Sequence, residues 1–162
     1  MKNYRDLFKS FFYAFRGIGS TILTERNMRI HLTCLVYMFS ILSLTDWFTL
    51  TRLDWAALIF ASALVIAGEL FNTAIENAVD LATNEYNEFA KKAKDAASGA
   101  VLVCAIGAVG VGLFVLLQPE AFEKMFRYFA QNIPMLVLFV LSIVPATLFI
   151  FFGFGKRGKK ND

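Results

Sequence analysis

The chain has 162 residues, of which 57% are hydrophobic and 15% are aromatic. Soluble globular domains contain about 45–50% apolar residues, so this composition excludes an ordinary soluble fold and indicates a membrane protein. The formal net charge is +3, but the basic residues flank the apolar stretches instead of forming one surface, which excludes a nucleic-acid-binding protein.

The first predicted element is an amphipathic helix over residues 4–22. Its apolar residues recur at helical spacing among polar and basic neighbours: Leu7, Phe8, Phe11, Phe12, Phe15, Ile18 and Ile22. Because basic and aromatic side chains suit the lipid headgroup region, we expect this helix to lie on the membrane surface. The alternative is a soluble helix that packs against a partner.

Four apolar segments follow, and each is predicted to cross the bilayer. The third and fourth carry no charged residue and are long enough to span a hydrocarbon core of about 30 Å. The first begins near Arg29 and His31, and the second continues into Glu69, so these two are predicted as spans with polar ends. The predicted spans cover residues 28–44, 55–82, 96–117 and 133–154.

The connections between these spans differ in their basic residues. With four spans, thirteen of the sixteen Lys and Arg residues fall on one side, and Arg52, Lys124 and Arg127 fall on the other. The positive-inside rule therefore predicts that both termini are cytoplasmic. We expect an external hairpin over 44–54, a cytoplasmic loop over 83–95 and an external amphipathic segment over 118–132.

A polar stripe continues the second span toward the predicted cytoplasmic loop. At about 100° per residue, Glu69, Asn72, Glu76 and Asp80 lie within a sector of about 80°, and Thr73 lies on the same side. An ionisable group inside a membrane costs at least about 2.5 kcal/mol and faces the bundle interior or a metal. This cost favours a functional role for the stripe over a purely structural polar network.

The residue types in the stripe indicate a hard cation. Carboxylate and amide oxygens suit magnesium, which proteins hold by one or two carboxylates together with substrate phosphates. Phosphoryl transfer uses such a metal to neutralise the transferred group, while a separate carboxylate accepts the proton of the attacking hydroxyl. Glu69 is the deepest carboxylate of the stripe, and we predict that it is this base.

The next charged segment offers cations for phosphates and polar groups for a nucleotide base. It runs from Asn84-Glu85-Tyr86-Asn87 to Lys91-Lys92-Ala93-Lys94-Asp95. Such a run is by itself more often a solvated loop, but the stripe before it favours a nucleotide site. The chain has no GxxxxGK[ST] motif, so side chains and metal would have to hold ATP.

Several motifs occur together in the chain. The stripe reads Glu69-x-x-Asn72-Thr73-Ala74-Ile75-Glu76-x-x-Val79-Asp80, and it is accompanied by Phe15-Arg16-Gly17, Glu25-Arg26-Asn27-Met28-Arg29-Ile30-His31 and Ala93-Lys94-Asp95-x-x-Ser98-x-Ala100-Val101-Leu102. Together they resemble the bacterial diacylglycerol kinase and undecaprenol kinase family over about residues 4–117. Glu25-Arg26-Asn27 is similar to the undecaprenol kinase branch of Gram-positive bacteria.

The resemblance implies an all-α integral membrane lipid kinase of the bacterial inner (cytoplasmic) membrane that uses ATP and Mg²⁺. Its implied acceptor is undecaprenol, with diacylglycerol as the alternative. Family members are homotrimers with active sites shared between subunits, which would explain how Glu25 and Glu76 meet.

The resemblance also implies residue roles. Glu69 is the catalytic base and contacts the lipid, Ser98 lies near the lipid, and Glu25 and Glu76 hold the metal bound to ATP. Thr73 and Asp80 support the site. An Arg near the N-terminus contacts phosphate in relatives, and Arg5 is the nearest candidate here. The residues implied to touch the nucleotide are Tyr13, Glu25, Asn72, Glu76, Glu85, Tyr86, Asn87, Lys94 and Asp95.

Relatives usually end after three spans, whereas this chain continues. We therefore expect a kinase domain over residues 1–117 and an extension over 118–162, whose fourth helix packs at the periphery of the core. The extension lacks the acidic, His or Arg clusters that a lipid phosphatase domain would need. Its basic end can meet anionic lipids through Lys156, Arg157, Lys159 and Lys160.

Two other classes of function are compatible with part of the sequence. In a small cation or proton transporter, Glu69, Glu76 and Asp80 would form an ion path. A structural or regulatory membrane protein is the third class. Both leave the matches around Glu25 and Lys94 unexplained.

His31 is interpreted as an interfacial residue at the start of the first span, outside the active site.

Overall fold

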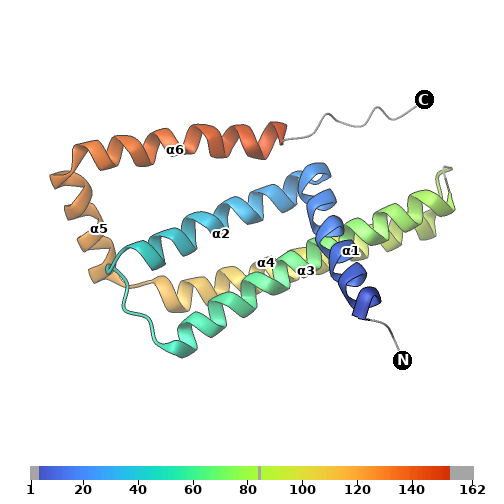
Figure 1. The fold of residues 1–162 in the computed structure, drawn as a ribbon, viewed down its shortest axis with the longest axis horizontal. Coiled ribbons are helices and arrows are strands. Elements are labelled where there is room, and N and C mark those ends of the chain that lie inside the picture. Colours follow the sequence, from blue (N-terminus) through green and yellow to red (C-terminus); the bar gives the residue numbers. More distant parts are fainter. Residues whose placement is uncertain (1–3, 84, 154–162) are drawn as a thin grey trace.

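The computed structural model describes residues 4–83 and 85–153, and these residues form six helices (Figure 1). Four of the helices, α2, α3, α4 and α6, are long and apolar enough to cross a membrane. The prediction of an all-α membrane protein with four spans is confirmed. The helices are α1 (Tyr4–Thr24), α2 (Arg26–Leu44), α3 (Arg52–Ala82), α4 (Glu88–Leu116), α5 (Pro119–Gln131) and α6 (Ile133–Phe152).

The long helices α3 and α4 pack side by side, and α2 lies between this pair and α6 (Figure 1). Gly68 lies at their interface, where a Cβ atom would be 3.6 Å from the Cα atom of Val101, an ordinary van der Waals distance. Leu58 and Val65 of α3 and Ala97 of α4 are buried. α3 continues without a break for 31 residues, so its apolar span and its polar stripe belong to one element.

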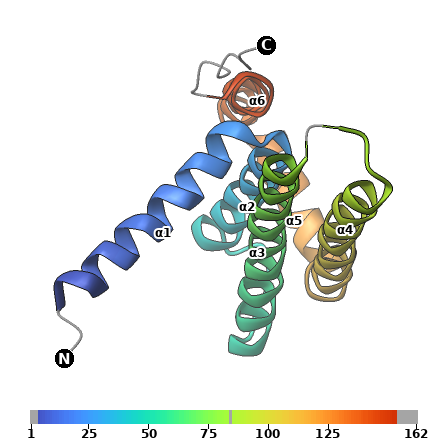
Figure 2. The ribbon, with the colours of Figure 1, turned by 90° about the vertical axis from the view of Figure 1, so that its right-hand side faces the viewer.

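The first helix runs across one end of the bundle and extends away from it (Figure 2). Large apolar side chains of α1 are exposed, among them Phe8, Phe11 and Phe12. These exposed side chains suit the surface position predicted for this helix. The chain then turns at Glu25, whose backbone N–H donates to the Thr21 carbonyl at 2.8 Å, and enters α2.

Two of the predicted loops are longer than those in the structure. The prediction of a loop over 83–95 is wrong for its second half, because α4 begins at Glu88. Asn87 caps this helix: its Oδ1 atom accepts from the backbone N–H groups of Phe89 at 2.8 Å and Ala90 at 3.2 Å. The segment that follows is rich in Ala and Lys, which favour helix, so the charged run extends α4 beyond its apolar part.

The hairpin predicted over 44–54 also ends early, because α3 starts at Arg52 instead of residue 55. A capping box explains the earlier start. The Thr51 hydroxyl accepts from the Asp54 backbone N–H, and the Asp54 carboxylate accepts from the Thr51 backbone N–H. Two of the four free N–H groups at this helix end are thereby satisfied.

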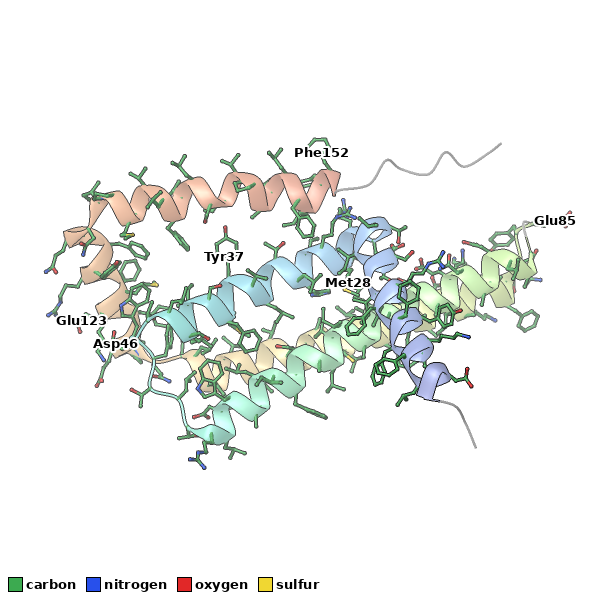
Figure 3. All side chains as sticks on the ribbon, viewed as in Figure 1. Met28, Tyr37, Asp46, Glu85, Glu123 and Phe152 are labelled. Atoms are coloured by element: carbon green, nitrogen blue, oxygen red, sulfur yellow. The ribbon has the colours of Figure 1, made fainter. Side chains whose placement is uncertain are left out.

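The C-terminal part of the described chain packs on α2. The predicted amphipathic segment forms α5, and its preceding residue Gln118 bonds to both the N–H and the carbonyl of Thr49 at 3.1 Å. α6 then runs beside α2, where Tyr37 points toward α6 and its hydroxyl lies 2.8 Å from Ser142 Oγ (Figure 3). Among the described helices, α6 therefore contacts α2 and α5, away from the α3–α4 pair.

Candidate functional site

Glu69 is a buried carboxylate in the middle of α3, with only 2% of its surface exposed. His31 of α2 places its Nε2 atom 3.4 Å from Glu69 Oε1. The Glu69 backbone carbonyl accepts a hydrogen bond from Thr73 Oγ1 at 2.9 Å. A carboxylate removed from water in this way depends on a polar partner, and His31 supplies it.

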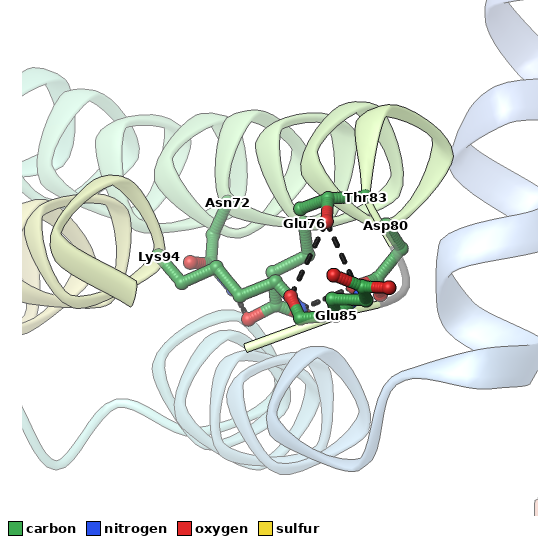
Figure 4. Close-up of polar contacts among 6 residues, drawn as sticks. All are labelled: Asn72, Glu76, Asp80, Thr83, Glu85 and Lys94. Carbon is green, nitrogen blue, oxygen red and sulfur yellow. Dashed lines mark hydrogen bonds and ion pairs between the residues drawn. The ribbon is translucent and has the colours of Figure 1, made fainter. Parts of the chain in front are cut away.

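A short hydrogen-bonded chain follows Glu69 along α3. Asn72 Nδ2 donates to Glu76 Oε1 at 2.9 Å (Figure 4), and Ser98 Oγ of α4 donates to Asn72 Oδ1 at 3.4 Å. Three residues predicted for the site thus meet between the two central helices. Their bonds orient the Glu76 carboxylate and join α3 to α4.

Beyond Glu76, a cleft of about 580 Å³ lies between the ends of α3 and α4 and the loop that joins them. Lys94 of α4 pairs with Asp80 of α3 inside this cleft (Figure 4). Thr83 Oγ1 accepts from the backbone N–H of Glu85 at 3.2 Å and shapes the loop. The residues predicted to touch a nucleotide that line the cleft are Glu85, Tyr86, Asn87, Lys94 and Asp95.

Glu25 approaches the site from the corner between α1 and α2. It occupies the N-cap position of α2, but its side chain does not cap the helix. It lines a cavity of about 400 Å³ together with Thr73 and Asn77 of α3. The cavity thus brings Glu25 to the α3 segment that also carries Glu69 and Glu76.

These acidic residues fit magnesium in their chemistry. Within the described part of a single chain, no group of three or more His, Cys, Asp or Glu side chains gathers closely enough to hold a metal ion. Magnesium, however, is usually held by one or two carboxylates, with waters and substrate phosphates as its other ligands. Glu25 and Glu76 can therefore contribute to such a site without forming a complete cage.

Some predicted residues are not brought to this region. Tyr13 lies on the exposed face of α1 with 62% of its surface accessible, and its ring contacts Phe12 instead of the α3–α4 cleft. The side chain of Arg5 lies outside the described residues, as do the basic residues of the C-terminal end, Lys156, Arg157, Lys159 and Lys160.

The contact of His31 with Glu69 was missed by the sequence analysis, which left this residue outside the site. The available signal was the position of an ionisable side chain inside an apolar span. Such residues are functional by default, and their partner is another polar group of the bundle. Helical spacing within α2 alone does not reveal this partner, because the contact joins two different helices.

The fold and the site define an integral membrane protein whose central helices carry a buried acid and, at one end, a polar cleft of ligand size. Residues 12–116 match the family model described as prokaryotic diacylglycerol kinase. The chain belongs to this family and thereby to the lipid kinases, as its resemblance implied. Membership of a kinase family implies ATP as the phosphate donor.

Three relatives illustrate this membership. A diacylglycerol kinase of Synechocystis is 44% identical over 70% of this chain and 64% of its own length. An undecaprenol kinase of Bacillus subtilis is 40% identical over 68% of this chain and 87% of its own length. A diacylglycerol kinase of Helicobacter pylori is 36% identical over 63% of this chain and 77% of its own length. These matches give no support to the transporter alternative.

Each of these three relatives extends beyond the region that matches this chain. The chain spans less than two thirds of the length of the Synechocystis relative. The family match ends at residue 116, so α5 and α6 lie beyond it.

Proposed function

We propose that this protein transfers the γ-phosphoryl group of ATP to the hydroxyl of a membrane lipid, with magnesium as the metal. Undecaprenol is the first proposed acceptor and diacylglycerol the alternative, since relatives named for both lipids are similar to this chain. The Glu25-Arg26-Asn27 sequence favours undecaprenol, because it resembles the undecaprenol kinase branch.

The observation that carries the proposal is the position of Glu69 between an apolar and a polar region. An apolar pocket of about 290 Å³ starts at His31 and continues between α2, α3 and α4, lined by residues such as Leu35, Val65 and Val109. On the other side of Glu69 the polar stripe leads to the α3–α4 cleft. Glu69 lies between these two cavities along α3 and lines neither, and we infer that a lipid tail and a nucleotide approach its carboxylate from opposite sides.

In the proposed reaction, Glu69 accepts the proton of the lipid hydroxyl, with Ser98 near the acceptor. The lipid oxygen forms a bond to the γ-phosphorus of ATP, and the bond from that phosphorus to the bridging oxygen breaks, releasing ADP. Magnesium, held by Glu25 and Glu76 with the phosphates, would neutralise the transferred group. Thr73 and Asp80 support the site through the Glu69 carbonyl and through Lys94.

The nucleotide is proposed to occupy the α3–α4 cleft. Its volume of about 580 Å³ lies within the roughly 300–1,000 Å³ of small-molecule sites. Lys94 would exchange its pairing with Asp80 for a phosphate, and the loop residues Glu85, Tyr86 and Asn87 would contact the base or ribose together with Asp95. Asn72 and Glu76 extend the site toward Glu69, whereas Tyr13 would have to reach it from another subunit.

The proposed assembly is a homotrimer in the bacterial cytoplasmic membrane, with both termini on the cytoplasmic side. Tyr13 is exposed and does not line the cleft, which supports active sites shared between subunits. The distribution of basic residues supports the orientation. A Lys92→Cys variant labelled from the external side of intact cells would contradict this topology.

The division into a kinase domain over 1–117 and an extension over 118–162 is also proposed. It is supported by the end of the family match at residue 116 and by the packing of α6 against α2. If the division is right, proteolysis between the two parts will leave a fragment of residues 1–117 that stays folded. Loss of its helical structure on cleavage would count against it.

The function is tested by transfer of labelled phosphate from ATP and magnesium to undecaprenol and to diacylglycerol in detergent. The wild type is compared with Glu69→Gln and with Glu123→Gln, which changes an exposed glutamate of α5. Because a general base contributes about 10²–10⁴-fold, we expect a loss of this size for Glu69→Gln alone. Wild-type protein that is folded but inactive on both lipids would refute the proposal, and the preferred lipid identifies the acceptor.

A further inference from the structure

Arg29 occupies the first turn of α2 and is buried, with 6% of its surface exposed. Its guanidinium donates three hydrogen bonds to backbone carbonyls of two other helices. Nη1 donates to Ile22 at 3.1 Å and to Leu23 at 3.0 Å, in the last turn of α1. Nε donates to Ile150 at 3.0 Å, in the last turn of α6. One side chain therefore joins three helices.

The acceptors of Arg29 are groups that a helix cannot satisfy internally. The last four carbonyls of a helix have no intrahelical partner, and this end of the helix carries a partial negative charge. The positive, forked guanidinium matches two such ends at once. A buried charge requires partners of this kind, so α6 helps to make the burial of Arg29 favourable.

Gly153 brings the end of α6 close to Arg29. Its backbone has φ 60° and ψ −164°, a conformation that is essentially restricted to glycine. A Cβ atom at this position would lie 3.3 Å from Arg29 Nη1 and 3.4 Å from its Cζ. The C-terminal end of α6 therefore packs directly against the Arg29 guanidinium.

The same corner holds the Glu25 carboxylate. The Glu25 backbone N–H donates to Thr21 in α1, and its carbonyl accepts from the Arg29 backbone N–H at 3.4 Å. Met28, between them, is fully buried. The Glu25 side chain does not cap α2 and lines the cavity beside α3.

We propose that Arg29 is a positioning residue through which the C-terminal helix α6 fixes the corner between α1 and α2 and so orients the Glu25 carboxylate. The inference rests on the proposed role of Glu25 in holding metal-bound ATP. The α6 half of this arrangement lies beyond residue 116, where the family match ends. It gives the fourth span a role in the kinase reaction beyond packing.

The experiment uses the full chain with two variants and one control. Arg29→Lys keeps the positive charge but replaces the forked guanidinium with a single ammonium group. Gly153→Ala keeps Arg29 but places a methyl group against it. Tyr37→Phe is the matched control, because it removes the hydrogen bond to Ser142, another contact between α2 and α6, without touching Arg29. If Arg29→Lys fails to fold, Gly153→Ala decides the question alone.

The first readout is hydrogen–deuterium exchange of the 22–29 segment in protein without metal or nucleotide. The second is the magnesium concentration that gives half-maximal phosphate transfer. We expect faster exchange in both variants and a rise of about tenfold in that concentration, as for changes in residues that support metal ligands. Tyr37→Phe is expected to leave both quantities at the wild-type value.

Unchanged exchange and unchanged magnesium dependence in Gly153→Ala would overturn the inference. An equal effect of Tyr37→Phe would overturn it as well, because α6 would then act only through general packing. The exchange measurement does not need kinase activity, so it separates the two proposals. Wild-type protein without transfer activity refutes the lipid kinase function, whereas active wild type with insensitive variants refutes only the role of Arg29.

Discussion

The pairing of Glu69 with His31 joins two helices at the centre of the proposed reaction. In His31→Leu the buried carboxylate loses its partner, at a cost of about 1–3 kcal/mol. We expect kcat to fall by about tenfold to a hundredfold, with the KM for ATP unchanged, because neither His31 nor any other residue of α2 lines the nucleotide cleft. Steady-state kinetics check this. A rise in KM with constant kcat would contradict the assignment, and His31→Gln, which retains a donor, should be milder.

The start of α4 depends on Asn87, which both caps the helix and lines the cleft. Asn87→Ala should lower the stability by about 1 kcal/mol, because the N-cap acceptor is lost, whereas Asn87→Ser should keep the cap. If the amide also contacts the nucleotide, Asn87→Ser will raise the KM for ATP while the thermal unfolding temperature stays near that of the wild type. If the Asn87→Ser variant has the wild-type KM for ATP, Asn87 caps α4 and does not contact the nucleotide.

The helices differ in how far the sequence determines them. The spans of α4 and α6 follow from uninterrupted apolar runs, and the stripe on α3 follows from helical periodicity. The start of α4 at Glu88 was missed because a charged run was interpreted as a loop, although a cap and strong helix formers were present. The contacts of His31 and Arg29 could not be derived, since they join helices whose relative placement depends on packing.

At the scale of the whole molecule, the proposed trimer predicts that inactive subunits can complement each other. Glu25→Gln and Glu69→Gln proteins should each be inactive alone. If an active site takes these residues from different subunits, mixed trimers will contain some sites with both intact residues, and activity will return. Phosphate transfer before and after unfolding and reassembly of the mixture measures this. Activity that stays absent in mixed trimers would show that Glu25 and Glu69 of one active site come from the same subunit.

The hydrogen bond from Arg29 to Ile150 spans 121 positions of the chain. At a synthesis rate of about 5–20 residues per second, the ribosome adds Ile150 on the order of ten seconds after Arg29. During that interval the guanidinium has the α1 carbonyls but not the end of α6. If Arg29 positions Glu25 as proposed, this corner is completed only when α6 has been inserted, and a chain that ends before α6 lacks a fully organised kinase site.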